Sequence, residues 1–398
     1  MSRAARLPLT LFAATAAQAL ATFTVFVLPV LAPLASATLG IGAQWIGVQM
    51  ALTYGAAAVT SAAVGPALLR FGPARCTQAA LAAAAFACAS YALAWLPGMA
   101  LGALATGLGY GLTNPAASQV LSRMTPPARR NMVFAIKQTG VPLGAALAGL
   151  LLPSLAQAIG WRGAALATAL VLAALTLAYT PFRAAWDTDR DPSVPLRANQ
   201  GGALRALRQR PGLLGLAIAG GTYSAIQLAF GAYLVTMLVA EFHWTPVAAG
   251  LATALVQVTG AVARIAWGWV ADRVGSGLRT LAAIGLLSAG SAALVPFATG
   301  WPQPAVLALL AFLGFCVAGW NGVLIAEADR LAAPGRAGEA VGGVLVLSFG
   351  GVVLGPSLQA LLVTLAGGYA PAFGLLALLP LAGAVVAWRT ARAPATPP

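Results

Sequence analysis

The sequence is poor in charged residues. Asp, Glu, Lys and Arg together make up 8% of its 398 residues, whereas soluble domains carry about 25%. Hydrophobic residues make up 60%, and the mean hydropathy is +0.87. A water-soluble fold of this size needs more charged residues on its surface. We therefore predict an integral membrane protein surrounded by a lipid bilayer.

The residues that usually build catalytic and metal centres are also scarce. The chain has one histidine and three cysteines. Cys76, Cys88 and Cys316 are too scattered in the sequence for a disulfide or metal framework, and His243 stands alone in an expected loop. We therefore predict no catalytic residue, no cofactor and no metal site, and we do not expect an enzyme.

Long apolar runs fill most of the chain. A transmembrane helix needs about 20 apolar residues, and twelve segments meet this length. They lie at 9–35, 43–68, 74–96, 98–122, 131–156, 161–182, 211–240, 245–270, 278–298, 303–328, 338–364 and 369–388. The sequence therefore predicts an all-α integral membrane fold with 12 transmembrane helices. The first run continues to Ala35, longer than a cleaved signal peptide needs, so we expect it to stay as a helix.

Positive charge is confined to alternate loops. The 22 basic residues are Lys137 and 21 arginines, and 19 of these arginines fall at the termini or in every second loop. They are Arg3, Arg6, Arg70, Arg75, Arg123, Arg129, Arg130, Arg183, Arg190, Arg197, Arg205, Arg208, Arg210, Arg273, Arg279, Arg330, Arg336, Arg389 and Arg392. The positive-inside rule makes that side the cytoplasm, with both termini there, in a plasma (inner) membrane. The basic pI is thus explained by topology, and we expect no nucleic-acid partner.

The chain reads as a duplication. A polar linker at 183–210 separates an N-terminal six-helix bundle, 1–182, from a C-terminal six-helix bundle, 211–398, and is expected in the cytoplasm. The motif GPALLRFG, with Arg70, recurs 203 residues later as GWVADRVG, and NPAASQVLSRMTPPAR recurs 207 residues later as NGVLIAEADRLAAPGR. Parallel repeats of this kind place a substrate site between the halves near the membrane midplane.

The loop sequence GWVADRVGSGLR resembles the signature of the major facilitator superfamily, G-x-x-x-D-R-x-G-x-x. The matching residues are Gly268, Asp272, Arg273 and Gly275. The resemblance implies two pseudo-symmetric six-helix bundles, the major facilitator fold, and transport by alternating access. It also implies a gating role for these four residues and for Arg70 in the first copy. In that copy Leu69 stands where the family has its aspartate, so the first copy is degenerate.

Two cations lie within apolar segments. The first acidic residue of the chain is Asp187, so the first six predicted helices, which contain Lys137, have no carboxylate. Arg264 lies eight residues before Asp272, about 12 Å from that end of its helix, and Lys137 is about 9 Å from the same side of the membrane. In the family, segments five and eight face each other, so the resemblance implies that Lys137 and Arg264 line one cavity. Two cations without an adjacent carboxylate favour an anion, and arginine can bind a carboxylate with two parallel hydrogen bonds.

Other interpretations of these charges stay open. Lys137 is close enough to the cytoplasm for its side chain to extend there, and Arg264 can be a structural partner of Glu327 or Asp272. Glu327 itself is a candidate proton-coupling group or a structural partner of Arg264 or of a loop arginine.

Polar side chains on the segments that line the cavity in this family complete the predicted site. They are Gln18, Thr22, Asn114, Gln138, Tyr223, Gln227, Tyr233, Trp320 and Asn321. Each can hydrogen bond a carboxylate, and each can equally make a hydrogen bond between helices.

We predict a secondary active transporter that moves a small organic anion, expected to be a carboxylate, as a proton symporter or an antiporter, and that acts as a monomer. The position of Arg264 and the run RRNMVFAIKQTGVPLG resemble the monocarboxylate and oxalate–formate branches of the superfamily. That resemblance is partial, because the acidic-glycine signature of helix one and the lysine of helix eleven are missing. Two alternatives remain, namely efflux of hydrophobic or cationic compounds and a transporter-like sensor that does not transport.

Overall fold

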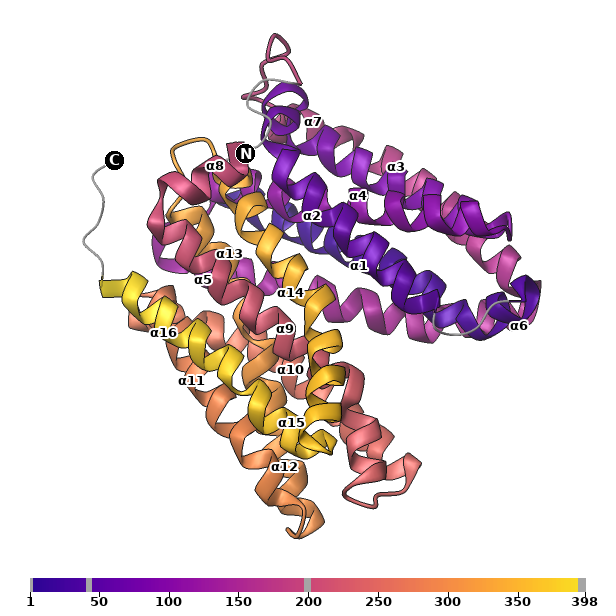
Figure 1. Cartoon of the computed structure of the whole chain (residues 1–398). Coiled ribbons are helices and arrows are strands. Elements are labelled where there is room, and N and C mark those ends of the chain that lie inside the picture. Colours follow the sequence, from indigo (N-terminus) through magenta and orange to yellow (C-terminus); the bar gives the residue numbers. More distant parts are fainter. Residues whose placement is uncertain (1–2, 41–44, 197–201, 393–398) are drawn as a thin grey trace. The chain divides into compact units, whose positions relative to one another are not determined.

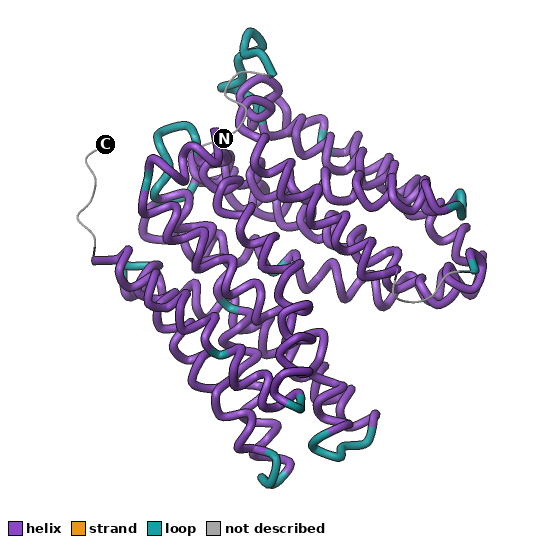
Figure 2. Tube along the Cα trace, in the orientation of Figure 1, coloured by secondary structure: helices purple, strands orange, loops and turns teal. Residues whose placement is uncertain are grey.

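The computed structural model describes residues 3–40, 45–196 and 202–392. Within these ranges every regular element is a helix, and no strand occurs (Figure 2). Arg197 and the first two residues of the expected segment 43–68 lie outside the described residues.

Up to residue 182 the long helices follow the apolar runs, and two short helices lie in the polar linker. Figure 1 labels the α-helices. The helices of the first half are α1 (Arg3–Leu39), α2 (Trp45–Phe71), α3 (Pro73–Ala92), α4 (Leu96–Met124), η1 (Pro127–Arg129), α5 (Arg130–Gln138), α6 (Gly140–Ala178), η2 (Thr180–Phe182), α7 (Arg183–Trp186) and α8 (Gly202–Gln209).

The long helices of the second half also follow the apolar runs. Its helices are α9 (Pro211–Ala240), α10 (Pro246–Val274), α11 (Gly277–Leu294), η3 (Val295–Ala298), α12 (Gln303–Ala318), α13 (Trp320–Arg330), α14 (Ala337–Ala366), α15 (Tyr369–Leu376) and α16 (Leu378–Arg392).

Nine helical stretches among the described residues are long and apolar enough to cross a membrane. One of them, Pro127–Trp186, has 60 residues, which is enough for two crossings of about 20. Its helix α6 bends at Gly160, where φ is 75°. The helices α3 and α4 add 20 and 29 residues. These helices are consistent with the predicted count of twelve.

Contacts between residues divide the chain into two compact units. Unit 1 comprises Met1–Thr125, Lys137–Ala206 and Ala332–Val346, and unit 2 comprises Pro126–Ile136, Leu207–Leu331 and Leu347–Pro398. Each unit therefore contains a short segment from the other half of the sequence. The segment 126–136 packs with unit 2, and the segment 332–346 packs with unit 1.

The backbone agrees with the duplication. Gly72 and Gly275, 203 residues apart, have φ of 86° and 69°, and Gly160 and Gly367, 207 residues apart, have φ of 75° and 74°. A positive φ is readily adopted only by glycine. Glycines with a positive φ therefore stand at equivalent points of both halves, although Gly72 precedes α3 with ψ of 160° and Gly275 ends α10 with ψ of 16°.

Helices cross at very short range within each unit. A Cβ atom at Gly144 of α6 would lie 2.1 Å from the Ala19 carbonyl oxygen of α1, and one at Gly351 of α14 would lie 2.0 Å from the Gly221 carbonyl oxygen of α9. Small residues allow such approach where apolar helices cannot gain from excluding water. The crossing of α1 and α6 positions the site around Lys137.

Candidate functional site

Lys137 lies at the junction of two helices. It is the penultimate residue of α5, and α6 begins at Gly140. A Cβ atom at Gly140 would lie 2.5 Å from the Thr15 carbonyl oxygen, so the backbone of α6 rests directly on α1. This close packing brings the lysine to Gln18, one turn further along α1.

The Lys137 ammonium is buried among neutral oxygens. The residue is 1% exposed, and its Nζ donates to Gln18 Oε1 at 2.6 Å, to Gln138 Oε1 at 3.3 Å and to Asn114 Oδ1. Gln18 Nε2 in turn donates to Thr22 Oγ1 at 3.4 Å. The three donors of the ammonium are satisfied, but each of these acceptors is an uncharged carboxamide, so the hydrogen bonds do not neutralise the charge.

Unit 2 gathers a second polar cluster. Gln227 Oε1 of α9 accepts from Trp320 Nε1 at 3.0 Å and from Asn321 Nδ2 at 3.4 Å, both from the start of α13. The amide oxygen faces two donors, so the Gln227 NH₂ group is the part left to donate elsewhere. Three predicted site residues are therefore in mutual contact.

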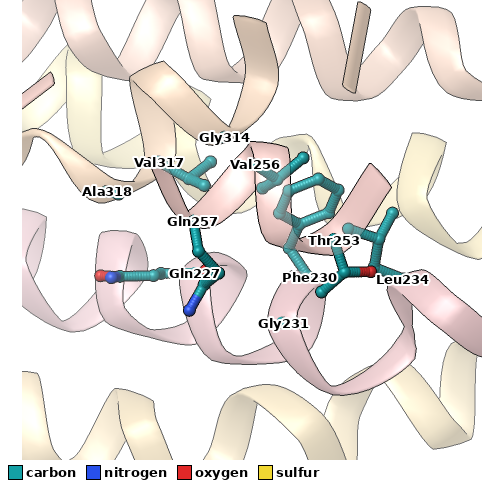
Figure 3. Close-up of a pocket in the computed structure, with 10 residues that line it drawn as sticks. All are labelled: Gln227, Phe230, Gly231, Leu234, Thr253, Val256, Gln257, Gly314, Val317 and Ala318. Atoms are coloured by element: carbon teal, nitrogen blue, oxygen red, sulfur yellow. The ribbon is translucent and has the colours of Figure 1, made fainter. Parts of the chain in front are cut away.

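Gln227 also borders a pocket of about 100 Å³ within unit 2 (Figure 3). The other lining residues come from α9, α10 and α12 and are Phe230, Gly231, Leu234, Thr253, Val256, Gln257, Gly314, Val317 and Ala318. The lining has no charged side chain and is mostly apolar. Its polar side chains are Gln227, Gln257 and Thr253. Such a pocket suits the uncharged part of a small molecule.

Arg264 lies on the same face of α10 as this pocket. It follows Gln257 by seven residues, which is two helical turns and about 10 Å along the axis. The residue is 5% exposed. A positive group and an uncharged pocket are thus arranged along one helix.

The two predicted tyrosines make contacts inside unit 2. The Tyr223 hydroxyl donates to the Leu281 carbonyl oxygen at 2.8 Å, and its ring centroid lies 6.1 Å from that of Trp320. The Tyr233 ring lies 5.9 Å from that of Tyr369. Tyr223 is 1% exposed, so a structural role accounts for its hydroxyl.

Glu327 binds the start of a neighbouring helix. Its Oε1 accepts from Gly277 N of α11 at 2.7 Å, and its Oε2 pairs with Arg330 at 2.7 Å. A carboxylate at a helix N-terminus is stabilised by the helix dipole and by the unpaired N–H groups there. Of the two roles considered, these contacts favour the structural one, with a loop arginine as partner.

Asp272 caps the docked start of α5 in unit 2. Its carboxylate accepts from Asn131 N at 3.1 Å, Asn131 Nδ2 at 2.8 Å and Met132 N at 2.9 Å. Nearby, Arg130 Nε pairs with Asp329 at 3.1 Å. Gly268 admits this docking, because a Cβ atom there would lie 2.5 Å from the Ala135 Cβ atom.

The other predicted gating residues have different partners. Arg273 places its guanidinium 4.9 Å from the centre of the Trp269 ring, and Gly275 ends α10 in the left-handed conformation. Arg70 Nη1 donates to the Val194 carbonyl oxygen at 3.0 Å. Arg70 therefore contacts the linker.

The linker supplies the carboxylates that the first half lacks. Asp187 Oδ1 accepts from Ala74 N of α3 at 2.6 Å, and its Oδ2 pairs with Arg75 at 2.9 Å. Arg123 pairs with Asp189 and donates to the Trp186 carbonyl oxygen at 2.6 Å. Burial raises the pKa of the Asp187 carboxyl, and the bonds from Ala74 and Arg75 act in the opposite direction.

Sequence reasoning did not assign roles to several of these contact residues. Asp187, Asp189 and Asp329 are visible as rare acids, and the absence of acids before position 187 was the signal that linker acids serve the first half. Gln257 carries no comparable signal, because a lone glutamine in an apolar helix is as often a packing residue.

Comparison with known proteins identifies the family. A family model described as Major Facilitator Superfamily matches residues 14–350. Monocarboxylate transporter 11 of Mus musculus is 28% identical over 302 residues, which cover 72% of this chain and 65% of that protein, slightly less than two thirds of its length.

Solved structures show the same fold. The E. coli fucose:proton symporter FucP superimposes with a TM-score of 0.76 at 15% identity, over 96% of this chain and 98% of that one. The human organic anion transporter MFSD10 (TETRAN) gives a TM-score of 0.75 at 17% identity, over 97% and 100% of the two chains. The chain belongs to the major facilitator superfamily, and it is an integral membrane protein.

Proposed function

We propose that this protein is a secondary active transporter and moves a small organic anion, a carboxylate, by alternating access. The observation that carries the proposal is the environment of Lys137, a buried cation whose hydrogen bonds all go to neutral amide oxygens. A buried charge is costly unless it is neutralised, and an anionic substrate supplies the missing charge.

Arg264 is proposed as the second positive contact, within unit 2. Its guanidinium can hold a carboxylate with two hydrogen bonds, and the uncharged pocket on the same face of α10 can receive the rest of the molecule. Asn114, Gln138, Gln227, Trp320 and Asn321 are proposed to complete the contacts. Tyr223 and Tyr233 are the weakest members of the predicted set, because ring packing and a backbone bond already account for them.

The relatives support this proposal without deciding the substrate. One is named as a monocarboxylate transporter and one as an organic anion transporter, and another is named as a fucose:proton symporter. We propose that transport is coupled to protons or occurs by exchange, and that Glu327 is structural. We also propose an inner-membrane location with both termini in the cytoplasm, which the arginine distribution supports, and a monomeric state.

Thermal unfolding of the detergent-purified protein tests the substrate class. The panel contains small carboxylates, inorganic anions, sugars and hydrophobic cations. A ligand specific for the folded state stabilises it by about 2.7 kcal/mol at one hundred times its dissociation constant. We expect a carboxylate to raise the Tm, and the shift to disappear in Lys137→Gln and in Arg264→Gln.

The matched control is Arg279→Gln, which removes an exposed arginine of the first turn of α11 and should leave the shift intact. Stabilisation by hydrophobic cations or by sugars alone, unchanged in the two variants, would overturn the anion proposal. A carboxylate that binds but is not taken up into proteoliposomes would favour a sensor.

A further inference from the structure

Gln119 of α4 holds the segment 332–346 against unit 1. Its Oε1 accepts from Gly338 N at 3.0 Å, and its Nε2 donates to the Gly335 carbonyl oxygen at 2.6 Å. One carboxamide thus binds both the turn at Gly335 and the first turn of α14. The first N–H groups of a helix lack partners within the helix, so the Gln119 oxygen acts as a cap.

The backbone of this segment lies directly on α2 and α4. A Cβ atom at Gly338 would lie 2.3 Å from Leu68 Cδ1 and 2.8 Å from the Pro115 carbonyl oxygen. At Gly342 it would lie 2.3 Å from the Ser61 carbonyl oxygen. Both glycines therefore permit a fit that a side chain would prevent.

In unit 2 the equivalent segment, 126–136, is held by a different capping residue. There Asp272 caps Asn131, the residue 207 positions before Gly338. The counterpart of Asp272 in unit 1 is Leu69, 203 positions earlier, which has no acceptor in its side chain. The counterpart of Gln119 in unit 2 is Ala326. The capping function has therefore moved to another helix.

We propose that Gln119 is a positioning residue of the transport cycle. It holds the start of α14 on unit 1 as Asp272 holds the start of α5 on unit 2, and its two hydrogen bonds break and re-form as the segment 332–346 leaves and rejoins unit 1. The inference rests on the proposed alternating-access function, but it can be tested without any substrate.

The test measures how often this segment leaves unit 1. Val64 of α2 is 1% exposed and lies under Gly342. We place a single cysteine there by Val64→Cys, with the three native cysteines replaced by alanine, and follow its reaction with a membrane-impermeant maleimide. Loss of a cap typically shifts such an equilibrium by roughly fivefold or more, so Gln119→Ala should speed alkylation about five- to thirtyfold.

Matched variants separate docking from general loosening. Gln78 also lies in unit 1 and bonds Thr176 and Arg183, outside the docked segment, so Gln78→Ala should leave the alkylation rate unchanged. Gln119→Glu keeps an acceptor for Gly338 but loses the donor to Gly335, so its alkylation rate should lie between those of the wild type and Gln119→Ala. Leu69→Asp restores the aspartate of the loop signature and should slow the alkylation of Gln119→Ala.

Three outcomes would overturn the proposal. One is an unchanged alkylation rate in a folded Gln119→Ala variant, and another is an equal increase in Gln78→Ala. The third is that Gln119→Glu, and Gln119→Ala combined with Leu69→Asp, are both alkylated as fast as Gln119→Ala. None of these results depends on the identity of the substrate, so absence of anion binding would contradict the proposed function alone.

Discussion

Asn114 and Asn321 occupy equivalent positions and have different tasks. Asn114 accepts a hydrogen bond from Lys137, whereas Asn321 donates to Gln227. The sequence shows the repeat but cannot show this difference, because the partner of each asparagine comes from another helix. The surroundings of the two asparagines differ because Lys137 has a valine, Val344, as its counterpart in the second half.

Replacing Asn114 by aspartate should neutralise Lys137 internally. We expect Asn114→Asp to raise the free energy of unfolding by about 1–3 kcal/mol, because an ion pair replaces a hydrogen bond from the ammonium to a neutral oxygen, and to abolish anion-induced stabilisation. Asn321→Asp is the control, because its contact is a glutamine, and it should not stabilise. Thermal unfolding with and without carboxylate measures both effects, and retained anion binding in Asn114→Asp would contradict the proposed role of Lys137.

Asp187 should make stability depend on pH in an unusual direction. Because burial raises its pKa in the folded state above 3.8, the folded state holds the proton more tightly than the unfolded state. Its contribution is full below pH 3.8, its ordinary pKa, and is lost as the pH rises through the raised value. The Tm difference between the wild type and Asp187→Asn should therefore grow as the pH falls towards 4.

Asp191 provides a control of opposite sign. Hydrogen bonds from Ser193 lower its pKa, so its contribution is present above the ordinary value and is lost as the pH falls through the lowered value. The Tm difference between the wild type and Asp191→Asn should shrink on acidification. A parallel response of the two variants would mean that at least one of the two carboxyls does not act as assigned.

At the scale of the helices, composition and the spacing of apolar runs were sufficient to predict the fold class. Apolar runs of about 20 residues predicted the helices, and the all-α membrane fold is confirmed. Breaks within runs were harder to predict. Thr139, between α5 and α6, and Gly319, between α12 and α13, interrupt the helices without a change in hydropathy, because packing against neighbours decides where these helices bend.

Close helix crossings can be tested with one pair of glycines on α6. Gly144→Val should lower the free energy of unfolding by about 1–3 kcal/mol, because its side chain would meet the α1 backbone. Gly149 has no atom within 4 Å of an added Cβ, so Gly149→Val is the matched control and should change stability little. Thermal unfolding of both variants in detergent decides the point, and equal losses would contradict the crossing.

At the scale of the whole chain, the exchange of segments was not predictable from the repeats. The expected boundaries at 182 and 211 follow hydropathy, whereas 126–136 and 332–346 are grouped by contacts with the other unit. Hydropathy reports which residues avoid water, and it does not report which neighbour covers them.

This exchange should keep the chain together after it is cut. A protease site inserted after Gln200 yields two fragments, each carrying a segment that packs with the helices of the other fragment. We expect the fragments to co-purify in mild detergent. Combining Asp272→Asn with Gln119→Ala in the cut protein should weaken co-purification, and complete separation without these substitutions would contradict the exchange.

The cap that Asp187 places on α3 also bears on the history of the gene. The corresponding cap on α11 is Glu327, and its counterpart in the first half is Val120. A linker residue can replace it only in a chain whose two halves are already joined. If the ancestral half carried an acid at this position, the first copy could lose it only after fusion, and that copy then depends on a segment that the single ancestor did not have.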